Sequence, residues 1–136
     1  MRSARSGAVQ EARMGAVNWL AVGVAALLAA GLAWPWYGLW RSTRGPAGWR
    51  MALMILPAAM IGHNFARVGL QHLAEKPKLY AMMSGGWALA IVLPVLAMAY
   101  GRHPMPPREA WADATYILAA FLLMGAVFMV MGPVAG

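Results

Sequence analysis

Residues Trp111–Met131 read WADATYILAAFLLMGAVFMVM, and Asp113 is the single charged residue in this stretch. A helix needs about 20 predominantly apolar residues to cross a bilayer, so the stretch is long enough to span one. Three earlier stretches have a similar length and composition, at residues 17–40, 51–68 and 79–100. The sequence therefore predicts an all-α integral membrane protein, a four-helix bundle formed by residues 17–136.

The composition argues against a soluble domain. Of the 136 residues, 62% are hydrophobic and only 11% are charged, which would leave a water-exposed surface largely apolar. The chain has no Cys, so disulfides, thiolate metal sites and cysteine nucleophiles are excluded. We predict no metal site, no cofactor and no catalytic residue.

The charge balance is basic, with 11 Lys and Arg against 4 Asp and Glu. These cations lie mainly in short segments between the apolar stretches, where anionic lipid headgroups attract them. We therefore expect the lipid bilayer as a partner and no nucleic acid. The basic segment 1–16 precedes an apolar stretch that is too long for the core of a signal peptide, so we expect this stretch to be retained as the first helix.

Lysine and arginine are divided almost evenly between the two ends of the predicted bundle. The second apolar stretch ends in a cluster of Arg67, Lys76 and Lys78, and such clusters favour the cytoplasmic side. On this basis we predict a multi-pass protein of the bacterial cell inner membrane with both termini in the cytoplasm.

The second stretch and its continuation carry the most polar segment near a span, GHNFARVGLQH at residues 62–72. On one continuous helix, residues three and four apart lie on the same face. The polar residues that would share this face are His63, Asn64, Arg67 and Gln71. Polar groups within a membrane are costly unless they are paired, so we expect the face to point into the bundle or at a partner, with His63 and Asn64 near mid-membrane.

Supporting residues follow from antiparallel packing. Ser84 and Trp87 of the third stretch are expected near His63. Asn18 of the first stretch is expected near Gln71 and His72. Pro57 and Pro94 are expected to kink the second and third helices.

Three functions compete for this face: a packing network between helices, a contact with another subunit or a lipid headgroup, and an ion or substrate path. No carboxylate lies at mid-membrane to carry a coupled proton, which disfavours the path. Haem bound through His63 would need a second His at matching depth on a facing helix. His72 is on the same helix and His103 is in a loop, so haem is a remote alternative that requires another subunit.

Asp113 lies near the start of the predicted fourth helix, where the helix dipole favours a carboxylate. Arg50 and Arg102 are expected at the same depth, so we predict an interfacial ion pair between Asp113 and one of these arginines. Aromatic residues are expected at this interface as anchors, namely Trp34, Trp36, Tyr37, Trp40, Trp49, Tyr100 and Trp111.

Two family resemblances concern different parts of the chain. Arg67-Val68, followed by Gln71, His72, Glu75 and Pro77, weakly resembles the second-helix signature of the glutathione-using membrane enzymes of eicosanoid metabolism, although the spacing differs. The motifs of the second resemblance are Asn18-Trp19-Leu20-Ala21-Val22, Trp36-Tyr37-Gly38, Asp113-Ala114-Thr115-Tyr116 and Met124-Gly125-Ala126.

These motifs resemble both ends of the small four-span bacterial family catalogued as domain of unknown function seventeen-sixty-one. Ile117 departs from the polar residue, commonly His, that the family has there, and the His63 segment has no counterpart motif. The resemblance implies a fold and a membrane location but no chemistry.

Together these observations predict a small non-enzymatic membrane protein. We expect it to act as an accessory or assembly subunit, through helix contacts with a second copy or within a larger membrane complex. The alternative is a small dimeric channel or transporter whose path is lined by the polar face of the second helix. A glutathione-type membrane enzyme and a haem-binding subunit are the remote alternatives.

Overall fold

The computed structural model describes residues 17–134, and its long elements are all helices. Four of them are long and apolar enough to cross a membrane, and they span Trp19–Leu39, Gly48–Val68, Lys78–Arg102 and Pro107–Met131. At 1.5 Å per residue, helices of this length measure about 31 to 38 Å, against about 30 Å for the hydrocarbon core of a bilayer. The predicted all-α fold, a bundle of four candidate membrane spans, is confirmed.

The first, second and fourth spans differ in regularity. The first and last are single α-helices, α2 (Trp19–Leu39) and α7 (Pro107–Met131). The second begins as the 3-10 helix η1 (Gly48–Met54), continues as α3 (Ile55–Val68), and is followed by the short helix α4 (Leu70–Glu75).

The third span is divided into α5 (Lys78–Trp87), the π-helical segment η2 (Ala88–Val92) and α6 (Leu93–Arg102). Pro94 explains the division, because it has no N–H to donate and its ring displaces the carbonyl of the preceding turn. The span is therefore irregular at its centre.

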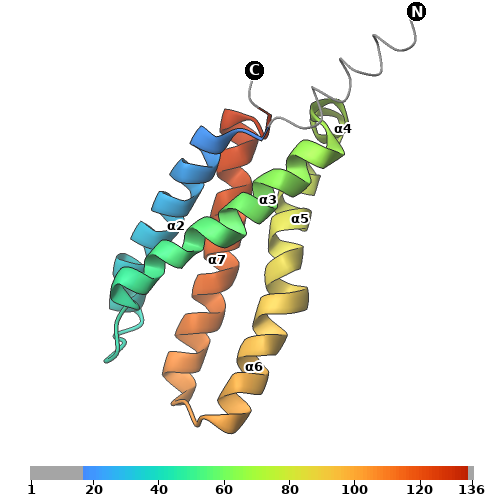
Figure 1. Cartoon of the computed structure of the whole chain (residues 1–136). Coiled ribbons are helices and arrows are strands. Elements are labelled where there is room, and N and C mark those ends of the chain that lie inside the picture. The colour runs from blue at the N-terminus through green and yellow to red at the C-terminus, as the bar shows by residue number, and fades with distance from the viewer. Residues whose placement is uncertain (1–16, 135–136) are drawn as a thin grey trace, which may run out of the picture.

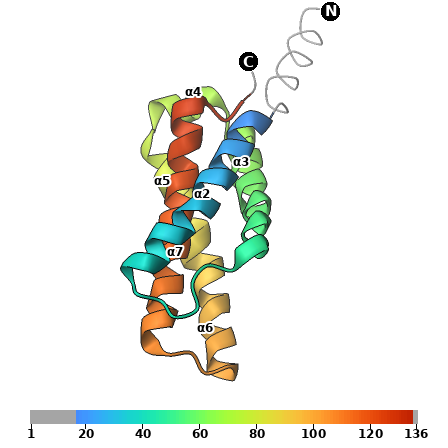
Figure 2. The ribbon, with the colours of Figure 1, turned by 90° about the vertical axis from the view of Figure 1, so that its left-hand side faces the viewer.

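Helix α7 lies at the centre of the bundle. Helix α2 packs along one side of it, α5 packs along another, and α3 crosses obliquely over α2 and α7 (Figure 1). Both ends of the described chain and α4 lie together at what we call the terminal end. The α2–η1 and α6–α7 connections lie at the opposite hairpin end, where the α6–α7 hairpin extends beyond α2 and α3 (Figure 2).

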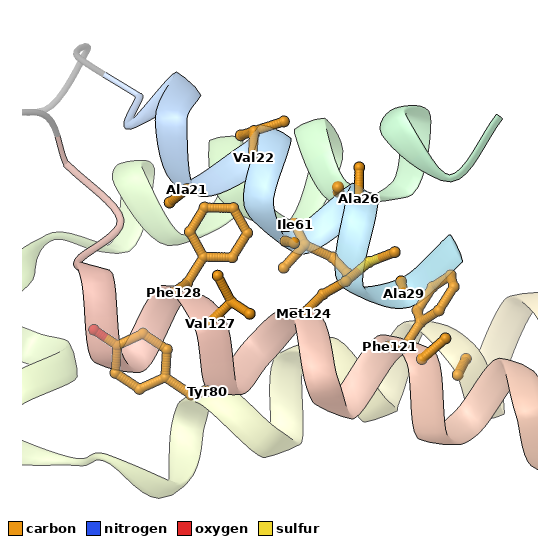
Figure 3. Packing of buried hydrophobic residues seen from close by; sticks show 14 of the residues in the cluster. Ala21, Val22, Ala26, Ala29, Ile61, Tyr80, Phe121, Met124, Val127 and Phe128 are labelled. Carbon is orange, nitrogen blue, oxygen red and sulfur yellow. The ribbon is translucent and has the colours of Figure 1, made fainter. Parts of the chain in front are cut away.

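In the core, small residues of α2 leave room for large side chains of α7. The fully buried small residues are Ala21, Ala25, Ala29 and Ala33. Opposite them, Phe121, Met124 and Phe128 project from α7 (Figure 3). In lipid, such close packing replaces the hydrophobic effect as the drive for helix association.

Two glycines show how closely the backbones approach. A Cβ at Gly62 would lie 2.7 Å from Cζ of Phe128, and one at Gly125 would lie 2.8 Å from the carbonyl oxygen of Tyr80. These distances are shorter than van der Waals contact, so α3 and α5 could not pack on α7 as they do with a larger residue at either position.

Candidate functional site

Asp113 on α7 connects three helices at the hairpin end. Its Oδ1 accepts a hydrogen bond of 2.5 Å from the hydroxyl of Tyr37, near the end of α2. Its Oδ2 accepts a hydrogen bond from the hydroxyl of Tyr100, near the end of α6. Hydrogen bonds to an ionised carboxylate are stronger than those between neutral groups, so one side chain ties α2, α6 and α7 together.

Neighbouring aromatic residues support this tie. The rings of Tyr37 and Tyr116 have centroids 5.6 Å apart, and the hydroxyl of Tyr116 donates to the carbonyl oxygen of Ala29 at 2.7 Å. Between the residues directly before these two tyrosines, Nε1 of Trp36 donates to Oγ1 of Thr115 at 3.3 Å. We call Tyr37, Tyr100, Asp113 and Tyr116 the tyrosine cluster.

Glu109, in the first turn of α7, holds the loop that follows α2. It accepts hydrogen bonds from the hydroxyl of Ser42 at 2.5 Å and from the backbone N–H of Thr43 at 2.9 Å. These donors are oriented by a turn in which Arg41 has a φ of 51°. In the same turn, the backbone N–H of Ser42 donates to the carbonyl oxygen of Tyr37. This is a helix-ending motif in which a left-handed residue redirects the chain.

Helix α7 starts earlier than predicted, and this changes the role of Asp113. Pro107 occupies the first position of the helix, where a fixed φ is favourable and the missing N–H costs nothing. Asp113 therefore lies about 9 Å along the helix, beyond the first turn. Glu109 takes the position that the helix dipole favours.

The structure gives Asp113 different hydrogen-bond partners from those predicted. The hydrogen bonds of its carboxylate come from Tyr37 and Tyr100. Arg50 has its guanidinium 5.6 Å from the ring centroid of Trp49, and Arg102 is exposed. The interfacial ion pair with one of these arginines remains a prediction.

The polar residues of α3 lie on the outside of the bundle. His63 and Arg67 are exposed and Asn64 is half-buried, while the opposite face of α3 buries Ile61, Phe65 and their neighbours. The expectation that this face points into the bundle is wrong. The inward positions are taken by apolar and small residues that fit the closely packed α2 and α7, so the alternative expectation, contact with a partner, is the one that remains.

Gln71 does not share that face. Helix α3 ends at Val68, and Gly69 adopts φ 93° before α4 begins, a conformation that favours glycine. The fourfold spacing that linked His63, Arg67 and Gln71 is therefore broken. His63 lies about 8 Å from the end of α3, halfway between that end and the centre of the span Gly48–Val68.

The predicted supporting residues serve other contacts. The buried hydroxyl of Ser84 donates to the carbonyl oxygen of Tyr80 at 2.6 Å, on the side of α5 that faces Gly125. Trp87 is half-buried and lines an apolar hollow with Met83. Neither Ser84 nor Trp87 has a hydrogen bond to His63 in the described part of the chain.

Asn18 closes the terminal end of the bundle. Its Oδ1 accepts from the N–H of Ala21 at 3.2 Å and its Nδ2 donates to the carbonyl oxygen of Gly132 at 2.9 Å. Its backbone N–H donates to the carbonyl oxygen of Pro133. Asn18 thus caps the start of α2 and satisfies a carbonyl at the end of α7. Among residues 17–134 it has no hydrogen bond to Gln71 or His72.

Within residues 17–134, no group of three or more His, Asp or Glu side chains is arranged to hold a metal ion. The predicted basic segment 1–16 lies outside the described residues. No protein-family model, curated protein or solved structure matches this chain. The function therefore has to be argued from the residues themselves.

Two parts of the hairpin end were missed by the sequence analysis. Tyr37 and Tyr100 were assigned to membrane anchoring, and Glu109 was given no role. The available signal was the shared depth of Tyr37, Tyr100 and Asp113 at the ends of three predicted helices. That signal cannot decide whether a tyrosine turns towards the lipid or towards a carboxylate.

Proposed function

We propose that this chain is a non-enzymatic protein of a bacterial inner membrane that acts as an accessory or assembly subunit through helix contact. The contact surface is the outer face of α3. The observation that carries the proposal is the exposure of His63 and Arg67 on a helix that belongs to a candidate membrane span.

The outer face of α3 changes character along its length. Together with Leu53 at the end of η1, its exposed residues at helical spacing form a stripe of Leu53, Leu56, Met60, His63 and Arg67. The first three suit lipid, whereas the last two do not. Ionisable residues in spans nearly always face protein or water, so this end of the stripe supports a protein partner.

His63 needs such a partner more than Arg67 does. The long side chain of Arg67 lies one residue from the end of α3 and can extend to the headgroup region. The shorter imidazole of His63 lies about 8 Å from the same end and cannot reach as far. A neighbouring helix that offers hydrogen-bond partners at this depth would satisfy it.

The chemistry of the face favours a partner of a different kind over a symmetric dimer. Arg67 has only donors, so a two-fold contact through this face would bring two guanidiniums together. A partner helix with a carboxylate or free carbonyls near its end would complement Arg67 and His63. This supports a place in a larger membrane complex.

The motif resemblance supports the same proposal in one respect. Asp113 and Tyr116 of the Asp-Ala-x-Tyr motif both belong to the tyrosine cluster, so in this chain the motif joins helices and has no need of a catalytic role. Membership of that family, which implies no chemistry, is compatible with a protein that works by contact.

The test is recovery of the protein from native membranes in a mild detergent, with particle mass, co-purifying proteins and visible absorption recorded together. The double variant His63→Leu with Arg67→Leu should insert and fold but lose its co-purifying protein. The matched control is Leu56→Met with Met60→Leu, which alters the same stripe without changing its polarity and should keep the partner.

Unchanged partner recovery in the double variant would refute the proposal. A colourless homodimer that conducts ions in liposomes would favour the alternative, a small dimeric channel or transporter. A haem absorption band that disappears with His63→Leu would instead indicate a haem shared between subunits.

A further inference from the structure

Helix α6 is attached to the bundle far more loosely than the other half of its span. It is the one helix among residues 17–134 that buries none of its residues, and it packs on α7 and on its own continuation, η2. Helix α5, in the same span, buries Tyr80, Ser84 and Gly85. The two halves of the third span therefore differ in what holds them.

A joint separates these two halves. The π-helical segment Ala88–Val92 lies directly before Pro94. A π-turn within an α-helix is rare and is frequently found at functional sites, and proline removes a backbone hydrogen bond next to it. Sharp bends in helices occur at such features. Among residues 17–134 the third span is the one that contains a π-helical segment, so it has a place to bend at its centre.

One side-chain hydrogen bond holds the far end of α6. The hydroxyl of Tyr100 donates to Oδ2 of Asp113, and this is the only side-chain hydrogen bond from α6 to another helix in the described chain. The other carboxylate oxygen is held by Tyr37 of α2. Asp113 thus stays fixed to α2 whether or not Tyr100 is bound.

We propose that α6 is a movable arm that pivots on η2 and is latched by Tyr100 to Asp113. Tyr100 is eight residues past Val92, about 12 Å from the pivot. A bend of about 20°, at the threshold of a sharp kink, would move it by about 4 Å and break the hydrogen bond. Release would expose one oxygen of Asp113 at the hairpin end without separating α2 from α7.

This inference does not depend on the contact proposed for α3. Bending of α6 leaves α5 packed against α7 through Ser84 and Gly125, and α3 packs on α2 and α7 rather than on α6. A test of the arm can therefore succeed or fail independently of the test of the α3 contact.

The absence of Cys allows paired spin labels without background labelling. The reporting pair is Met98→Cys on α6 and Leu39→Cys on α2, which are 73% and 81% exposed. The reference pair is Met82→Cys on α5 with the same Leu39→Cys. Distances are measured by pulsed electron paramagnetic resonance in lipid nanodiscs.

Met98 is six residues past Val92, about 9 Å from the pivot, so Tyr100→Phe should broaden the Met98–Leu39 distribution or shift it by about 3 Å. The Met82–Leu39 distribution should keep its width and mean. The matched control is Tyr116→Phe, which removes a hydrogen bond of 2.7 Å between α7 and α2 but none from α6. It should leave the Met98–Leu39 distribution as it is in the parent protein.

Three results would overturn the proposal. The first is an unchanged Met98–Leu39 distribution in Tyr100→Phe. The second is equal broadening of both pairs, which would indicate general loosening of the bundle. The third is the same broadening with Tyr116→Phe, which would show that the effect is not specific to the latch.

Discussion

The polar residues that join parts of the bundle differ from those on the outer face of α3 in whether the chain itself supplies them with hydrogen-bond partners. Asp113, Glu109 and Asn18 are met by hydroxyl or backbone groups from other parts of the chain. His63 and Arg67 are turned outwards and left exposed. The polar groups that join the helices have hydrogen-bond partners within the bundle. Those on the outer face of α3 have none on another helix among residues 17–134, so a neighbouring protein could supply them.

This contrast separates stability from assembly. Removing a polar group that joins helices should destabilise the folded chain, because its partners lose their hydrogen bonds. Removing an exposed polar group should leave the fold intact and affect only what binds there. The following variants test this division in order of expected effect, each as a change in the free energy of unfolding in detergent followed by tryptophan fluorescence.

Asp113→Ala should have the largest effect. Two tyrosine hydroxyls lose a charged acceptor, and the loss of such bonds suggests a destabilisation of about 3 kcal/mol. Asp113→Asn, which keeps one carbonyl acceptor, is the matched control and should fall between the variant and the parent. Equal stability of Asp113→Ala and the parent protein would show that the tyrosine cluster does not hold the bundle.

Asn18→Ala should have an intermediate effect. It removes the cap of α2 and the hydrogen bond to the carbonyl oxygen of Gly132, and loss of a helix cap costs about 1 kcal/mol. Asn18→Asp retains the acceptor for the N–H of Ala21 but not the donor to Gly132, so it separates the two contributions. A loss in Asn18→Ala as large as that of Asp113→Ala would contradict the expected order.

His63→Leu with Arg67→Leu should have the smallest effect on folding, within about 0.5 kcal/mol of the parent protein. Both side chains are exposed and neither has a hydrogen-bond partner on another helix among residues 17–134. The same variant should lose its protein partner, so the two measurements together distinguish assembly from stability. A destabilisation above about 2 kcal/mol would mean that these residues belong to the fold after all.

Much of the fold follows from the sequence because the bilayer imposes a length and a composition on every span. The starts and ends of the helices are less readily predicted. The fourth span begins at Pro107 rather than at Trp111, because its first residues include charges that a hydropathy pattern assigns to a loop.

The candidate site was predicted only in part. The sequence singles out Asp113 and predicts an ion pair with Arg50 or Arg102, which remains a prediction. It does not predict the hydrogen bonds that the carboxylate accepts from tyrosines on α2 and α6. Helical spacing alone also placed Gln71 on the same face as His63. The sequence does not show whether Gly69 continues the helix or ends it, and in the structure its left-handed conformation ends α3.

The sequence alone determined that the chain forms membrane helices and where the apolar runs lie, because these properties depend on local composition and on the thickness of the bilayer. Only the tertiary structure decided which face of each helix turns inwards. In lipid, apolar and small residues can face either way, so the inward face is set by how closely helices fit together, as at Gly62 and Gly125. That fit placed Asp113 between two tyrosines and turned His63 and Arg67 to the outside.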